Sequence, residues 1–94
     1  MIERRSKREI YFREQDYTTE KYVVPYIQKY LKLSHQLRVL EIGCGEGGNL
    51  KYFIDIGCEV VGVDLNTKQL ENAKTFTKQF CKDTSKTKLL NLNI

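Results

Sequence analysis

The amino-acid sequence predicts an α/β protein, the N-terminal half of a doubly wound fold with a parallel sheet. Apolar β-favouring runs alternate with segments of helical periodicity, in the order helix, strand, helix, strand, helix, strand. The strands are too far apart for hairpins, so a helix joins each pair, and consecutive βαβ crossovers build a parallel sheet with right-handed connections. With 94 residues, the chain has room for one core.

Composition narrows the class of protein. Hydrophobic residues make up 40% of the chain and charged residues 30%, which is typical of a globular protein. No apolar run approaches the roughly 20 residues that span a bilayer, and no signal peptide is indicated, so we expect a cytoplasmic protein without a membrane anchor. Cys44, Cys58 and Cys81 are widely spaced, which predicts reduced thiols and no metal site.

The charge distribution gives the chain a mildly basic character. The net charge is +4, and basic residues stand at positions 4, 5, 7 and 8. Glu3 and Glu9 interrupt this cluster, and an apolar stretch follows it. Nucleic acid is therefore an open but weakly supported partner.

The first predicted element is a helix that Thr18 or Thr19 caps and that continues to Leu31. Pro25 falls early in this helix, where its missing N–H costs least. One side of the helix carries Val23, Ile27, Tyr30 and Leu31. Tyr22, Tyr26 and Tyr30 form a neighbouring stripe, which we interpret as packing; the functional alternative is a lid over a flat ligand such as adenine.

The remaining elements follow in order along the chain. An apolar β-favouring run at 38–42 leads into a glycine-rich segment at 43–48, and a second such run occupies 60–64. The helix between them ends at Gly57, where a left-handed residue belongs. Asn66 and Gln69 resemble a capping box that begins a second crossover helix, and its apolar face continues to Phe80. Residues 89–92 predict a third strand.

The glycine-rich segment carries the main functional signal. Gly43, Gly45 and Gly48 satisfy Gly-x-Gly-x-x-Gly between a strand and a helix, and Asp64 ends the next strand. Glycine allows the chain to turn sharply and lets a ligand approach the backbone. Asp64 is then expected to accept hydrogen bonds from the two hydroxyl groups of a ribose.

Glu41 separates two classes of nucleotide ligand that this loop suits equally. It stands two residues before Gly43, where its carboxylate would repel the pyrophosphate of NAD. A ligand with an ammonium group and a cationic sulfur would be attracted instead. A nicotinamide-dependent oxidoreductase domain therefore remains as the alternative that Glu41 disfavours.

These two segments resemble a known family. Val39-Leu40-Glu41-Ile42-Gly43-Cys44-Gly45-Glu46-Gly47 is similar to the first motif of class I S-adenosylmethionine (SAM)-dependent methyltransferases, and Gly62-Val63-Asp64-Leu65-Asn66 resembles their second-strand motif. The resemblance covers Thr18 to Phe80. It implies a partial Rossmann-like SAM-binding domain with a helical segment at 1–35, a βαβαβ unit at 36–94 and no C-terminal half.

The resemblance also implies roles for individual residues. The backbone of Gly43, Cys44 and Gly45 would border the methionine part of SAM, and Glu41 would orient its ammonium end. Asp64 would hold the ribose, with Leu65 and Asn66 beside the adenine. Asn93 is a candidate for the adenine amino group, and an ordinary strand-end residue is its other interpretation. His35 is expected in a surface loop, and no catalytic residue is assigned.

What the chain does with a bound cofactor depends on parts that lie outside it. In the full family fold the first strand is central, so its outer edge would be unpaired here and could lead to self-association. The methyl acceptor is unidentified, and methyl transfer by these residues alone is not expected. A truncated, non-catalytic remnant that acts as an interaction module is the third hypothesis.

Overall fold

The computed structural model describes residues 2–93, with side chains from residue 7 onward. It contains a three-stranded sheet in the order β1 (Arg38–Ile42), β2 (Glu59–Asp64) and β3 (Thr87–Asn91). Both strand pairs are parallel, and Val61 of β2 is in register with Leu40 of β1 and Lys88 of β3. The predicted α/β fold with a parallel sheet is therefore confirmed.

Two crossovers connect the strands, as expected. The short 3-10 helix η2 (Gly48–Leu50) and α3 (Lys51–Asp55) lead from β1 to β2, and α4 (Thr67–Phe80) leads from β2 to β3. Gly57 has a φ of +91° after α3, as its predicted place at the helix end requires. Asn66 caps α4 because its Oδ1 accepts a hydrogen bond from the Gln69 amide at 2.9 Å.

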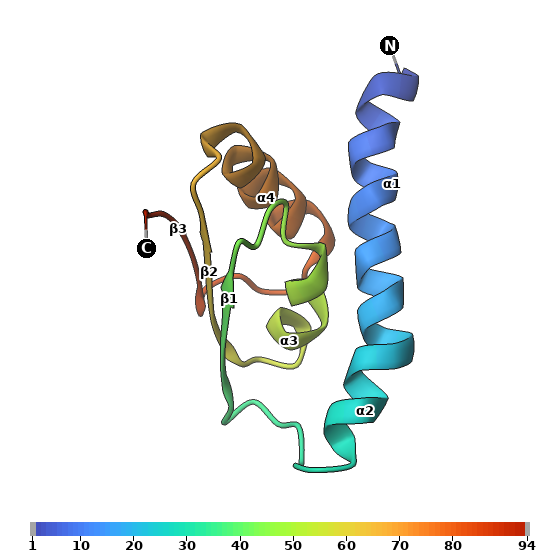
Figure 1. Ribbon diagram of the computed structural model, residues 1–94, viewed down its shortest axis with the longest axis vertical. Coiled ribbons are helices and arrows are strands. Elements are labelled where there is room, and N and C mark those ends of the chain that lie inside the picture. Colours follow the sequence, from blue (N-terminus) through green and yellow to red (C-terminus); the bar gives the residue numbers. More distant parts are fainter. Residues whose placement is uncertain (1, 94) are drawn as a thin grey trace.

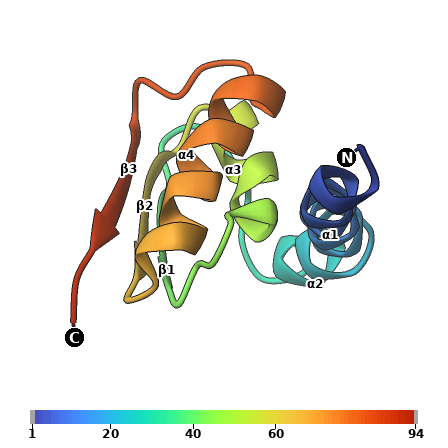
Figure 2. The same ribbon diagram turned by 90° about the horizontal axis from the view of Figure 1, so that it is seen from above.

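All helices lie on one face of the sheet (Figures 1 and 2). The core sits between that face and the helices, where Leu50, Val60 and Leu70 are almost fully buried. The opposite face has no helix over it among residues 2–93. Leu40 and Ile42 of β1 are 61% and 63% exposed there. β1 is also an edge strand of the described sheet, in line with the expectation from the sequence.

The N-terminal segment is longer and more helical than the sequence indicated. α1 (Ile2–Thr18), a π-helical turn η1 (Thr19–Val23) and α2 (Val24–Gln28) follow one another without a break. The prediction that a helix begins at Thr18 or Thr19 was wrong, since Thr18 has helical φ and ψ values and makes no capping hydrogen bond. α1 is held by Phe12, whose ring lies 5.5 and 5.6 Å from those of Phe76 and Phe80.

The π-helical turn shifts the buried face of this helix by one residue. Thr19 is 3% exposed, and α-helical spacing would next bury Val23, as the sequence analysis assumed. Instead, Val23 is 43% exposed and Val24 only 5%. In η1 the amide of Val24 donates a hydrogen bond to the Thr19 carbonyl oxygen, five residues back. Pro25 follows directly, and its ring is incompatible with the regular α-helical hydrogen-bond pattern.

The tyrosine stripe does not pack into the core. Tyr22, Tyr26 and Tyr30 are 61%, 58% and 72% exposed, so their interpretation as packing was wrong. Tyr26 and Tyr30 contact each other edge to face, with ring centroids 5.4 Å apart. The stripe faces outward because the shifted register directs Val24 to the core in place of its neighbours.

Candidate functional site

The loop after β1 bends over the carboxyl end of β2. The amides of Gly43 and Cys44 both donate to the Val63 carbonyl oxygen, at 2.7 and 2.9 Å. Gly43, Gly45 and Gly47 have φ values of +77°, +56° and +88°, which residues with a Cβ rarely adopt. The backbone path therefore requires glycine at these positions.

The outer side of this loop is open at Gly43. A Cβ added to Gly43 would meet no atom within 4 Å, so a ligand can approach this backbone closely. Cys44 turns its side chain inward and is 3% exposed. Burial, reinforced by the charges of Glu41 and Asp64, raises the pKa of the Cys44 thiol to about 11. The thiol stays protonated and inert at neutral pH, and only the backbone of Cys44 can border a ligand.

Asp64 holds the loop with both carboxylate oxygens. Oδ2 accepts a hydrogen bond from the Gly45 amide at 2.7 Å, and Oδ1 accepts one from the Asn66 amide at 2.8 Å. In a full capping box the Gln69 side chain would accept the hydrogen bond from the Asn66 amide, and here Asp64 accepts it instead. Each carboxylate oxygen can accept a second hydrogen bond, so Asp64 keeps capacity for the hydroxyl groups of a ligand.

A cavity of about 220 Å³ opens on the Asp64 side of the loop. It lies at the carboxyl ends of the strands, where sheets of this type bind ligands. Leu65, which is 66% exposed, and Asn93 line it together with Asp64 and Gly43. Asn93 thus shares a cavity with three of the predicted site residues, and its contact with an adenine stays a prediction.

Glu41 lines a second cavity, of about 390 Å³, which shares no lining residue with the first. Residues of η1 and α2 form the wall opposite β1, including Thr19, Val23 and Ile27. The Glu41 Oε2 atom accepts a hydrogen bond from Asn49 Nδ2 at 3.3 Å. Its Oε1 atom is buried and has no hydrogen-bond partner among the described residues.

The electrostatics of Glu41 reflect this position. Burial raises the pKa of its carboxyl group, the hydrogen bond from Asn49 lowers it, and the charge of Asp64 raises it further. A buried carboxylate oxygen without a donor is an open acceptor for a cationic group. The charges of Glu41 and Asp64 both raise the pKa of the Cys44 thiol, so both carboxylates lie close to this loop. Each of them lines its own cavity.

Glu46 is a site residue that the sequence reasoning missed. It lies inside the glycine-rich loop with 2% exposure, and its Oε2 atom accepts hydrogen bonds from Arg8 Nε at 2.9 Å and Asn72 Nδ2 at 2.7 Å. Arg8 belongs to the basic cluster considered for nucleic acid, whereas the side chains of Arg4 and Arg5 lie outside the described ones. Glu46 therefore ties α1 and α4 to the loop, which no local sequence pattern indicates.

Gly48 has a structural role in the same contact. A Cβ at Gly48 would lie 2.5 Å from the Phe12 carbonyl oxygen and 2.7 Å from Gln15 Cβ. The third glycine of the motif thus allows α1 to lie against the loop.

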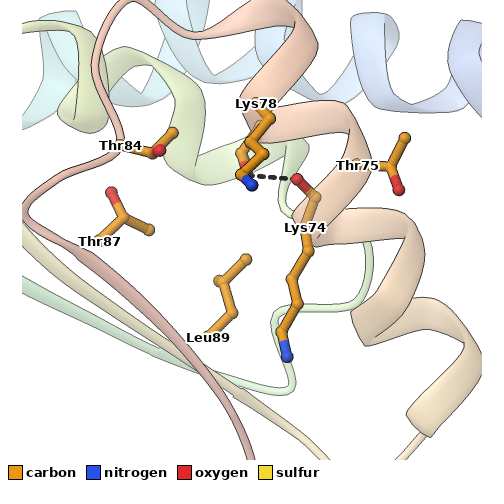
Figure 3. A pocket seen from close by; sticks show the side chains of 7 residues that line it. Lys74, Thr75, Lys78, Thr84, Thr87 and Leu89 are labelled. Atoms are coloured by element: carbon orange, nitrogen blue, oxygen red, sulfur yellow. Dashed lines mark hydrogen bonds between the residues drawn. The ribbon is translucent and has the colours of Figure 1, made fainter.

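A further cavity, of about 440 Å³, lies away from the glycine-rich loop, between α4 and β3 (Figure 3). Lys74 and Lys78 reach over it from α4, and Thr84, Thr87 and Leu89 form its other side. It contains no predicted site residue. In the described part of the chain no cluster of metal-ligating side chains is found, and no helix is long and apolar enough to cross a membrane. His35 is exposed, as expected.

Comparison with known proteins identifies the family. A family described as "Methyltransferase domain" matches residues 39–92, more than half of the chain. The chain therefore belongs to this methyltransferase family. The nicotinamide-dependent and non-catalytic alternatives gain no support from the comparisons.

Individual relatives extend well beyond this chain. Malonyl-[acyl-carrier protein] O-methyltransferase from Enterobacter lignolyticus (strain SCF1) is 49% identical over 37 residues, 39% of this chain and 15% of that protein. The PH0226 protein from Pyrococcus horikoshii OT3 aligns at a TM-score of 0.58 and 31% identity, over 72% of this chain and 28% of that one. PKMT2 from Rickettsia typhi, solved in complex with AdoHcy, aligns at a TM-score of 0.56 and 32% identity, over 65% of this chain and 12% of that one. The chain spans less than a third of each.

Proposed function

We propose that the chain is the SAM-binding part of a methyltransferase whose acceptor is unidentified. One observation carries this proposal: the buried Oε1 atom of Glu41 has no hydrogen-bond donor within the described part of the chain, and it lies next to a loop whose Gly43 backbone is open to a ligand. The two carboxylates suit SAM as hydrogen-bond acceptors. Glu41 lines a cavity where an ammonium group can lie, and Asp64 lines a cavity where ribose hydroxyls can lie.

The residues divide the binding between them. Glu41 accepts a hydrogen bond from the ammonium group, the backbone of Gly43, Cys44 and Gly45 borders the methionine part, and Asp64 accepts hydrogen bonds from the ribose. Leu65 and Asn66 lie beside the adenine. Bound SAM supplies an activated methyl group on a sulfonium, so alignment and exclusion of water provide most of the catalysis.

Three further parts of the proposal concern the whole protein. We infer a helical segment at 1–35 and a βαβαβ cofactor unit at 36–94, because the last N-terminal helix ends at Gln28 and β1 begins at Arg38. We also infer a fragment of a larger methyltransferase domain, supported by the greater length of the relatives. A cytoplasmic location fits three free thiols, at Cys44, Cys58 and Cys81.

Glu41→Gln tests the cofactor site directly. Glutamine keeps the shape and can still accept the hydrogen bond from Asn49, but it removes the charge. Affinity for S-adenosylhomocysteine (SAH), measured by calorimetry, should fall roughly 10- to 150-fold, which corresponds to about 1.5–3 kcal/mol for a hydrogen bond to a charged group. The unliganded variant should melt at the same or a higher temperature, because burial disfavours the charge of Glu41.

The matched control is Glu59→Gln, which removes an exposed carboxylate at the start of β2 and should leave both readouts unchanged. NAD is the competing ligand, since a ligand that binds the folded state raises the melting temperature. A rise with NAD and none with SAM or SAH would refute the proposal, as would equal SAH affinity of the wild type and Glu41→Gln.

A further inference from the structure

A chain of two hydrogen bonds connects the N-terminal helix with Glu41. The Thr19 hydroxyl donates to Asn49 Oδ1 at 2.8 Å, and Asn49 Nδ2 donates to Glu41 Oε2 at 3.3 Å. Thr19 comes from η1 and Asn49 from η2, so residues far apart in the sequence meet at the wall of the Glu41 cavity. A carboxylate only accepts hydrogen bonds, so the Asn49 amide must turn its NH₂ to Glu41 and its oxygen to Thr19.

The local structure explains why Thr19 is available for this contact. A threonine hydroxyl within a helix usually bonds to the carbonyl four residues earlier. Here Thr19 is 3% exposed and begins the π-helical turn, and its hydroxyl donates across to Asn49 instead. π-Helical turns are frequent at functional sites because they redirect single side chains.

We propose that Thr19 and Asn49 are positioning residues for Glu41: they hold its Oε2 atom so that Oε1 stays directed to a cationic group of the cofactor. This inference rests on the proposed function and extends it to the N-terminal helix. Neither residue touches the cofactor in this proposal; both act through the Glu41 carboxylate.

The surroundings of Glu41 make its titration a sensitive readout. Among the residues that line its cavity, from α1, η1, α2, β1, η2 and α3, no other side chain is charged. Beyond that lining, Asp64 raises the pKa of Glu41, and the Cys44 thiol is neutral at ordinary pH. The hydrogen bond from Asn49 lowers the pKa of Glu41, so its loss must raise that pKa.

Three variants test the chain of contacts. Asn49→Ala removes the amide donor, Thr19→Val removes the hydroxyl but keeps the shape, and Thr19→Ser keeps the hydroxyl. The pKa of Glu41 in the unliganded chain is measured by NMR of its carboxyl carbon. It should rise in Asn49→Ala, rise less in Thr19→Val and keep its wild-type value in Thr19→Ser.

Cofactor affinity gives the second readout. The dissociation constant of SAH at neutral pH should increase about 2- to 10-fold in Thr19→Val, as expected for one neutral hydrogen bond, and stay unchanged in Thr19→Ser. On acidification, affinity should be lost at a higher pH in Asn49→Ala than in the wild type, because its Glu41 is protonated earlier. Thr18→Val, the same kind of change one residue earlier in the same cavity wall, is the matched control and should change nothing.

The outcomes separate the two proposals. If the wild type binds SAH but Thr19→Val has the wild-type Glu41 pKa and SAH affinity, the positioning role is overturned. If the wild type fails to bind SAM or SAH, the proposed function fails, and the NMR measurement still decides whether Thr19 and Asn49 control Glu41. Should Asn49→Ala not fold, the pair Thr19→Val and Thr19→Ser decides alone.

Discussion

The ion pair between Arg8 and Glu46 predicts an asymmetric loss of stability. Arg8 Nη2 lies 2.8 Å from Glu46 Oε2, and the side chains are 47% and 1% exposed, respectively. Arg8→Met leaves the buried Glu46 carboxylate without its cation, which should cost about 3–5 kcal/mol of the free energy of unfolding. Glu46→Gln leaves the half-exposed Arg8 hydrated by water, and only the charged hydrogen bonds are lost, about 1.5–3 kcal/mol.

Urea denaturation followed by circular dichroism measures both variants, with equal m-values as the check that the same surface unfolds. The double variant Arg8→Met/Glu46→Gln should lose less than the sum of the two single losses, because its buried side chain is neutral. Glu9→Gln is the control in the same helix, since its partner Arg13 lies 3.2 Å away in an exposed pair and the loss should stay below about 1 kcal/mol. A Glu46→Gln loss equal to or above that of Arg8→Met would refute this reasoning.

Two other features give predictions. Burial, together with Glu20, raises the pKa of Asp16 from 3.8 to about 6, so the folded state binds the proton more tightly and the free energy of unfolding falls as pH rises from 3.8 to about 6. Asp16→Asn should remove this part of the pH dependence; a wild-type and variant difference that is constant between pH 4 and 7 would contradict it. Leu40→Lys, on the exposed edge strand β1, should reduce the self-association that sedimentation velocity measures, whereas the control Leu31→Lys should not. Equal sedimentation of Leu40→Lys and the wild type would exclude this edge as the contact.

The strands and crossover helices could be predicted because their signals are local. The apolar residues of β2 form a short uninterrupted run in the sequence. Gly57 marks the end of a helix through its positive φ, and Asn66 marks the start of one through its capping side chain. α1 gave no such signal. Its attachment depends on Phe12 within a charged segment and on Gly48, where the absence of a Cβ allows the helix to approach. Contacts of this kind become visible only when both partners are placed in space.

The same distinction applies to the candidate site. The spacing of Gly43, Gly45 and Asp64 follows from a strand that turns into a helix, so the sequence could indicate it. Glu46, by contrast, is paired with Arg8 across 38 positions of the chain, and no periodicity relates the two. The π-helical turn was unpredictable for another reason: it inserts one residue into a regular pattern, so α-helical spacing from Thr19 selects Val23 in place of Val24, although Ile27 still packs against the core.

The two carboxylates of the site differ in how far the protein already uses them. Both oxygens of Asp64 accept backbone amide hydrogen bonds, so the loop itself depends on this residue. One oxygen of Glu41 accepts a hydrogen bond from a side chain, and the other has no donor among residues 2–93, so its desolvation is not compensated in the unliganded fold. A substitution at Asp64 must therefore disturb loop geometry and ligand contacts together, whereas Glu41→Gln keeps an acceptor for Asn49 and breaks no hydrogen bond to the backbone of the loop. For this reason Glu41, and the hydrogen bonds that hold it, are the part of the site where binding can be separated from folding.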